Sequence, residues 1–85
     1  MTQKQVDQLT RALRQQFKGR VEAEKIVGRT GRYRFAVKSE KFAAMTQLQR
    51  QDAVWKIADK VLPPEATLGI SLILTFAPKD LVPSA

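Results

Sequence analysis

Residues 68–76 read LGISLILTF, and this stretch decides the fold. Apolar residues occupy both of its alternations, which is typical of a strand that lies beside a neighbouring strand. The stretch follows a helical segment at 46–62 that stops before Pro63. A helix that joins two strands of one sheet reverses the chain. We therefore predict that residues 68–76 lie parallel to the strand before the helix, after a right-handed crossover.

Two earlier stretches, residues 21–28 and 32–39, alternate between apolar and charged side chains and predict an antiparallel hairpin. Apolar residues on the same face must pair across it. The register that groups most of them has three pairs: Val27 with Tyr33, Lys25 with Phe35, and Ala23 with Val37. This register leaves a three-residue loop, in which we expect Gly31 to take the left-handed conformation.

Helical periodicity predicts an amphipathic first helix, with Thr2 capping its start and Gly19 its end. Its apolar positions are Val6, Leu9, Leu13 and Phe17. A short helical segment is predicted at 40–45, before the helix at 46–62. The broad apolar side of that longer helix includes Leu48, Trp55, Ala58 and Leu62. We expect Trp55 to anchor the core.

These segments predict the order α-β-β-α-β, an α+β fold with two layers. Helices cover one face of a three-stranded mixed sheet in this prediction. A chain of 85 residues has room for one hydrophobic core. We therefore expect a single domain at 1–77 and a frayed tail at 78–85.

The chain contains neither cysteine nor histidine. Thiolate nucleophiles, disulfides, the usual metal ligands and the acid–base group that titrates near neutral pH are therefore all missing. We expect no enzyme, no metal and no cofactor, and no small-molecule substrate is evident. The apolar run at 68–76 is far shorter than the roughly 18 residues that span a membrane. Since the first residues show no secretory pattern, we expect a cytoplasmic protein.

The net charge of +7 lies in one half of the sequence. Residues 1–42 contain 11 basic and four acidic side chains, whereas residues 43–85 are balanced. This asymmetry predicts a polyanionic partner, DNA or RNA, although a solvated surface that keeps a small domain soluble is the simpler alternative. The candidate nucleic-acid-binding cations are Arg11, Arg14, Lys18, Arg20, Arg29, Arg32, Arg34, Lys38, Lys41 and Arg50.

Residues 28–31 match the GxxG loop with which KH domains bind phosphates. That loop joins two helices, whereas this one lies between predicted strands, so a hairpin turn is the favoured interpretation. Recognition of bases on the sheet face, as in RRM domains, needs exposed aromatic side chains. Tyr33 and Phe35 alternate with arginines, and we expect both rings in the core.

Residues 34–42, RFAVKSEKF, resemble the second strand of the BolA family and the serine-acidic-basic-phenylalanine segment after it. Arg50 and the pair Val54-Trp55 keep the spacing of the family pattern, and residues 74–76 resemble its closing strand. The resemblance implies a BolA-like fold, which is similar to a type II KH domain.

Four positions depart from the family pattern: its histidines are replaced by Gln51 and Gly69, a basic residue by Asp52, and a glycine by Ala44. In the family, the histidine that opens the last strand binds a [2Fe-2S] cluster shared with a monothiol glutaredoxin, with help from a hairpin-loop cysteine or histidine. Iron in such sites prefers thiolate and imidazole. The resemblance therefore implies the fold without the metal role, and a cluster carrier is disfavoured.

The family's second proposed activity is DNA binding and transcriptional regulation through a helix-turn-helix-like region between strands two and three. The residues at the corresponding positions are Lys41, Gln47, Gln49, Arg50 and Gln51. Glutamine and arginine can read base edges, although a polar surface turn is the alternative. The leading hypothesis is a non-enzymatic BolA-like protein that binds nucleic acid through its basic half. The other is an adaptor that docks a monothiol glutaredoxin-type partner without an iron-sulfur cluster.

Overall fold

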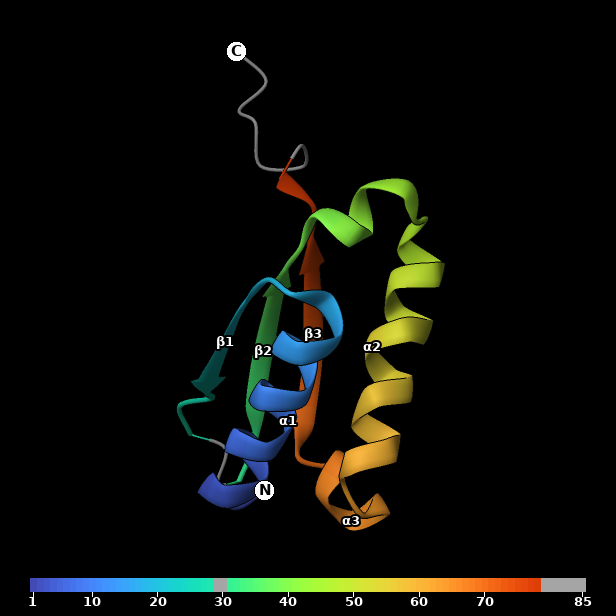
Figure 1. Cartoon of the computed structure of the whole chain (residues 1–85). Coiled ribbons are helices and arrows are strands. Elements are labelled where there is room, and N and C mark those ends of the chain that lie inside the picture. The colour runs from blue at the N-terminus through green and yellow to red at the C-terminus, as the bar shows by residue number, and fades with distance from the viewer. Residues whose placement is uncertain (29–30, 79–85) are drawn as a thin grey trace.

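The computed structural model describes residues 1–28 and 31–78 (Figure 1). Its elements in this part of the chain are α1 (Gln3–Phe17), β1 (Arg20–Lys25), β2 (Tyr33–Lys38), η1 (Glu40–Ala44), α2 (Gln47–Val61), α3 (Pro64–Thr67) and β3 (Ile70–Phe76). Arg29 lies outside the described residues. The predicted tail at 78–85 also lies outside them, apart from Pro78.

The three strands form one sheet in the order β1-β2-β3. Strand β1 pairs antiparallel with β2, and β3 pairs parallel with β2 from the other side. The connection from β2 to β3 runs through η1, α2 and α3. The predicted α+β fold with a mixed sheet is therefore confirmed, and β1 and β3 are the two edges of that sheet.

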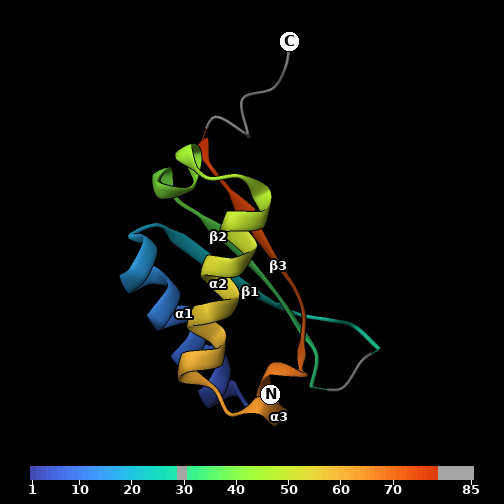
Figure 2. The same cartoon turned by 90° about the vertical axis from the view of Figure 1, so that its right-hand side faces the viewer.

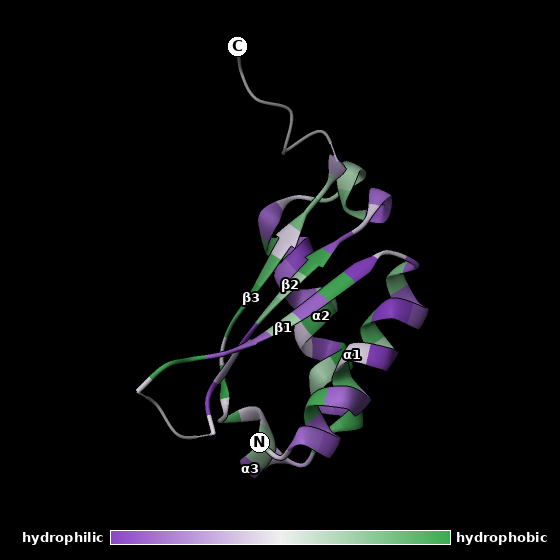
Figure 3. Cartoon of the chain, turned by 90° about the vertical axis from the view of Figure 1, so that its left-hand side faces the viewer, coloured by the Kyte–Doolittle hydropathy of each residue, from purple (hydrophilic) through white to green (hydrophobic). Residues whose placement is uncertain are grey.

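Helices α1 and α2 cover one face of the sheet, and the other face is open (Figure 2). The view from the opposite side has the strands in front of α2 (Figure 3). The core between the two layers is apolar. Its members include Val6, Leu9, Leu13, Phe17, Val21, Phe35, Val37, Phe42, Val54, Ala58 and Ile73.

The predicted register of the hairpin is wrong by two residues. Val21 pairs with Val37, and Ala23 pairs with Phe35. This register places Val21, which is 2% exposed, in the core and leaves Val27 97% exposed. A slip of two residues keeps every side chain on its predicted face, so the alternation alone could not detect it.

The hairpin loop is longer than predicted. The N–H of Ile26 donates to the carbonyl of Arg32 at 3.0 Å, so the loop comprises residues 27–31. Gly31 has the expected positive φ of 74°, and Gly28 has a positive φ of 81° as well. Two glycines therefore allow the chain to turn where one was expected.

The apolar side of α2 also differs from the prediction. Leu48 is 72% exposed, whereas Arg50 is buried with Val54 and Ala58. Successive helical residues are about 100° apart around the axis, so residues two positions apart point in nearly opposite directions. Because Arg50 faces the core, Leu48 faces solvent. Trp55 packs against the core but is only partly buried. Within the described residues, no helix is both long and apolar enough to cross a membrane.

The two ends of α1 differ in how well they were predicted. Thr2 caps the start, where its hydroxyl accepts from the N–H of Gln5 at 3.1 Å. At the other end, Lys18 and not Gly19 has the left-handed conformation, with φ 50°. Gly19 instead packs on β2, because a Cβ there would lie 1.9 Å from the carbonyl oxygen of Lys38.

Candidate nucleic-acid interface

Five of the predicted cations gather at one end of the molecule, which we call the basic end. They are Arg14, Lys18, Arg20, Lys38 and Lys41, all of them exposed. They come from four different places in the fold: the last turn of α1, its C-cap, the paired ends of β1 and β2, and η1.

The hairpin register holds two of these cations together. Arg20 lies directly opposite Lys38 across β1 and β2. The close packing of Gly19 on the carbonyl of Lys38 brings Lys18 to the same place. Like charges opposite each other on neighbouring strands destabilise a sheet. The two cations therefore repel each other unless an anion lies between them.

Contacts with the main chain hold two more cations at this end. The Nη2 of Arg14 donates to the carbonyl of Val21 at 3.2 Å. The Nζ of Lys41 donates to the carbonyl of Gln16 at 3.0 Å, near the end of α1. None of the five cations forms an ion pair with an acid in residues 1–28 or 31–78.

A small hollow opens on the sheet beside Arg20 and Lys38. Its volume is about 220 Å³, and its lining consists of Arg20, Glu22, Ala36, Lys38 and Phe76. Phe76 is partly buried and lies next to Lys38 in the parallel register. The hollow therefore combines two cations with an aromatic ring and one carboxylate.

Sequence reasoning missed Phe76 as a functional candidate. Strand β3 has a register shift at Ser71, since Tyr33 pairs with Ile70 but Arg34 pairs with Leu72. Ile70 is consequently buried, while Leu72 and Leu74 lie on the open face with Phe76. The alternation from Leu72 to Phe76 was the available signal, but both alternations of this strand are apolar, so the sequence did not show which of them lies on the open face.

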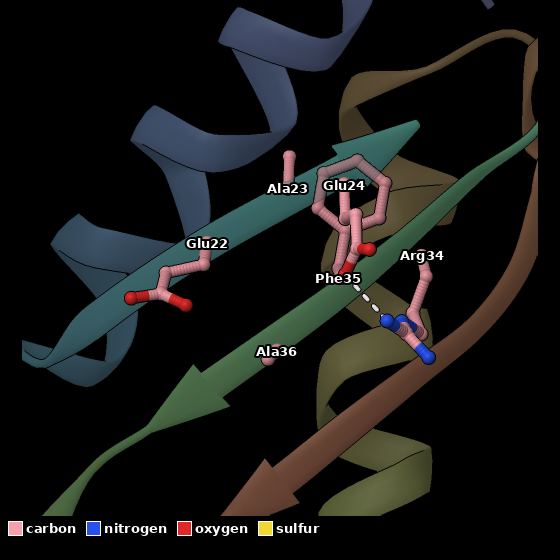
Figure 4. A pocket seen from close by; sticks show the side chains of 6 residues that line it. All are labelled: Glu22, Ala23, Glu24, Arg34, Phe35 and Ala36. Carbon is pink, nitrogen blue, oxygen red and sulfur yellow. Dashed lines mark hydrogen bonds and ion pairs between the residues drawn. The ribbon is translucent and has the colours of Figure 1, made fainter. Parts of the chain in front are cut away.

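A larger hollow of about 460 Å³ lies further along β1 and β2 (Figure 4). Arg34 is the cation in its lining, and it forms an ion pair with Glu24. Glu22 lines the same hollow. Two carboxylates and one neutralised arginine disfavour a phosphate here, so Arg34 does not contribute to the basic end.

Two predicted cations remain. Arg11 lies one turn before Arg14 on α1, and these two arginines line one shallow hollow together with the carboxylate of Asp7. Arg32 precedes β2, six residues before Lys38. That separation corresponds to about 20 Å along a strand. The basic half of the sequence is therefore not one continuous surface.

Arg50 is not a surface cation, so it must be removed from the predicted contacts. It is 5% exposed. Its Nε donates to the carbonyl of Phe42 at 3.0 Å and to that of Met45 at 3.2 Å. Its guanidinium carbon lies 5.8 Å from the centre of the Phe42 ring. Arg50 thus fastens η1 to α2, a structural role that its spacing in the sequence did not reveal.

The three candidate glutamines also bond within the chain. Gln49 accepts from the N–H of Thr46 at 2.9 Å as part of a capping box. Gln51 donates to the carbonyl of Ile73 at 2.9 Å, and it accepts from Trp55 Nε1 at 3.3 Å. Gln47 accepts from the hydroxyl of Thr75 at 3.4 Å. Reading bases with these amides would require breaking contacts that hold α2 in place.

Gly69, which the resemblance places where a cluster-binding histidine was expected, has no room for a side chain without a shift of the backbone. A Cβ on Gly69 would lie 2.7 Å from the carbonyl oxygen of Gly31 and 2.8 Å from Met1 Cγ. Among the described residues, no group of three or more His, Cys, Asp or Glu could hold a metal ion. The residues present therefore do not fit an iron-sulfur cluster.

No protein-family model matches this chain, and no curated protein matches it.

Proposed function

We propose that this chain is a non-enzymatic, BolA-like protein that binds the phosphate backbone of nucleic acid through the basic end. The observation that carries the proposal is the convergence of five exposed cations without an acidic partner among the described residues. A surface made only for solubility would gain nothing from placing Arg20 directly opposite Lys38.

A polyanion that binds at the basic end relieves the repulsion between Arg20 and Lys38. Each phosphate that a lysine or arginine neutralises releases condensed counterions, so binding becomes weaker as the salt concentration rises. The proposal concerns the backbone and not base reading. It therefore makes no use of Gln47, Gln49 or Gln51, whose amides bond within the chain.

A salt titration of binding tests the proposal. Fluorescence anisotropy with a labelled 20-nucleotide duplex and its single strand measures the affinity between about 20 and 300 mM NaCl. The double variant Arg20→Gln, Lys38→Gln should bind at least tenfold more weakly at low salt. Its slope of log affinity against log salt should be smaller by about two, because two phosphate contacts are lost.

The matched control removes the same charge elsewhere. Lys56 and Lys60 are exposed on α2, away from the basic end. Lys56→Gln, Lys60→Gln should keep nearly the wild-type affinity. Equal losses in the two double variants, or no binding by the wild type at low salt, would contradict the proposal.

A ¹⁵N NMR titration separates nucleic acid from a protein partner. With oligonucleotide, amides near Lys18, Arg20 and Lys38 should shift. With a monothiol glutaredoxin, the proposal expects no shifts. A salt-resistant set of shifts with the glutaredoxin alone would instead favour the adaptor alternative.

A further inference from the structure

We infer that the chain binds single-stranded nucleic acid across the open face of its sheet, with a base stacked on Phe76 and phosphates at Arg20 and Lys38. The inference deepens the proposed function, because it depends on the same two cations. It adds the kind of nucleic acid and the surface that contacts the bases.

Three side chains form a row across the open face at the basic end. Lys38 pairs with Arg20 on one side and with Phe76 on the other. Neighbouring strands are about 4.8 Å apart, so the ring and both cations lie within the reach of one nucleotide. These three residues line the same hollow.

An apolar row continues along β3 from this point. Leu72 and Leu74 are each 39% exposed and share the open face with Phe76. Ala36 lies beside Leu74 in the register and is partly exposed. No element within the described residues covers this face (Figure 3). The row offers bases an apolar surface about three residues long.

This combination favours a single strand over a duplex. Bases in a duplex are stacked on each other, whereas a single strand presents their faces to aromatic and apolar side chains. A duplex at the basic end would meet the cations alone and leave the apolar row in water. A single strand can neutralise the cations with its phosphates and cover the apolar row with its bases.

The charges also disfavour a second copy of this chain as the occupant. Each copy carries a net charge of +7. Two copies packed face to face would bring Arg20 and Lys38 of each toward the same interface.

Glu22, which lines the hollow beside Arg20, repels the phosphates of a nucleic acid. Removal of this carboxylate should therefore strengthen binding of a single strand.

Substitution of the ring tests the inference. Phe76→Leu keeps an apolar side chain on β3 but removes the stacking surface. Anisotropy with labelled dT12 should show about a tenfold loss of affinity, whereas a hairpin duplex of the same charge should bind as it does to the wild type. Leu48→Ala, which alters an exposed apolar residue on α2, is the control and should change neither affinity.

Two further variants keep the inference testable if Phe76→Leu unfolds. Phe76→Trp retains an aromatic surface, so it should bind dT12 at least as tightly as the wild type. Its emission should also be quenched more strongly than that of Trp55 in the wild type. Glu22→Gln should bind dT12 two- to fivefold more tightly.

The outcomes separate this inference from the proposed function. If dT12 and duplex bind equally and substitutions at Phe76 change neither, the inference is wrong while the proposed function stands. If neither nucleic acid binds at low salt, both are wrong.

Discussion

Lys18 and Gly19 show how two adjacent residues share the end of a helix. Glycine is the usual residue in the left-handed position after a helix. Here lysine takes that conformation, with φ 50°, at a cost of about 1–2 kcal/mol. The glycine is needed one position later, where any Cβ would collide with the carbonyl oxygen of Lys38. Close approach of the two chain segments therefore decides where the glycine stands.

Gly19→Ala should destabilise the protein by about 3 kcal/mol. The added Cβ would lie 1.9 Å from a backbone oxygen, so β1 must move away from β2. Gly28→Ala is the matched control. It also adds a methyl group, but nothing lies within 4 Å of it, and only its positive φ opposes the change. Its cost should be about 1 kcal/mol.

Urea denaturation of both variants provides the measurement. Equal losses of unfolding free energy would mean that the contact between Gly19 and Lys38 is not close.

At the scale of the elements, β3 is an edge strand that exposes two leucines, Leu72 and Leu74. Unpaired edges of this kind invite pairing with other chains. A side chain of α2 occupies part of this edge, because Gln51 donates to the carbonyl of Ile73. The amide thus satisfies a backbone acceptor and protects the edge at the same time.

Gln51→Ala should lower the unfolding free energy by about 1–2 kcal/mol, because the Ile73 carbonyl loses its donor. It should also increase self-association, which sedimentation velocity at several protein concentrations would detect. Gln8→Ala, at an exposed position of α1, is the control and should change neither property. A fully monomeric and equally stable Gln51→Ala variant would show that the edge is protected in another way.

The sequence predicts every element except the four-residue helix α3, because each of the others has a strong periodicity or cap of its own. It fails where two elements must be aligned. The hairpin slip of two residues leaves the alternation unchanged. The irregularity at Ser71 is hidden because both alternations of β3 are apolar. The basic end depends on the true register, so the charge count located the basic half but not its surface.

The burial of Arg50 illustrates a further limit. A charged residue is expected on the surface, and its spacing matched a family pattern for contacts with DNA. The carbonyls of Phe42 and Met45 decide otherwise, since these acceptors need a donor where η1 meets α2. That need arises only after η1 has folded against the helix.

For the whole molecule, the excess of positive charge lowers the stability of the folded state. A net charge of +7 and the facing pair Arg20 and Lys38 repel within the folded state. Salt screens this repulsion. The surface proposed to bind nucleic acid therefore lowers the stability of the chain that carries it.

The wild type should consequently gain about 0.5 kcal/mol of unfolding free energy between 20 and 300 mM NaCl. Lys38→Gln should be more stable than the wild type at low salt and should gain less from salt, because one member of the facing pair is gone. Urea, which is uncharged, is the suitable denaturant. Identical salt responses of the two proteins would contradict repulsion at this pair.

The 3-10 helix η1 joins parts of the chain that are far apart in sequence. The Ser39 hydroxyl donates to the carbonyl of Phe17 at 2.6 Å, and the Ser39 N–H donates to that of Phe76 at 2.9 Å. Phe42 lies against Phe17, with ring centres 4.8 Å apart, and accepts from Arg50. During synthesis, β3 leaves the ribosome after every other described element, and domains fold as units. A nascent chain that stops before Phe76 therefore lacks the last partner of this junction. The packing of α1 and β2 around η1 stays incomplete until β3 is present.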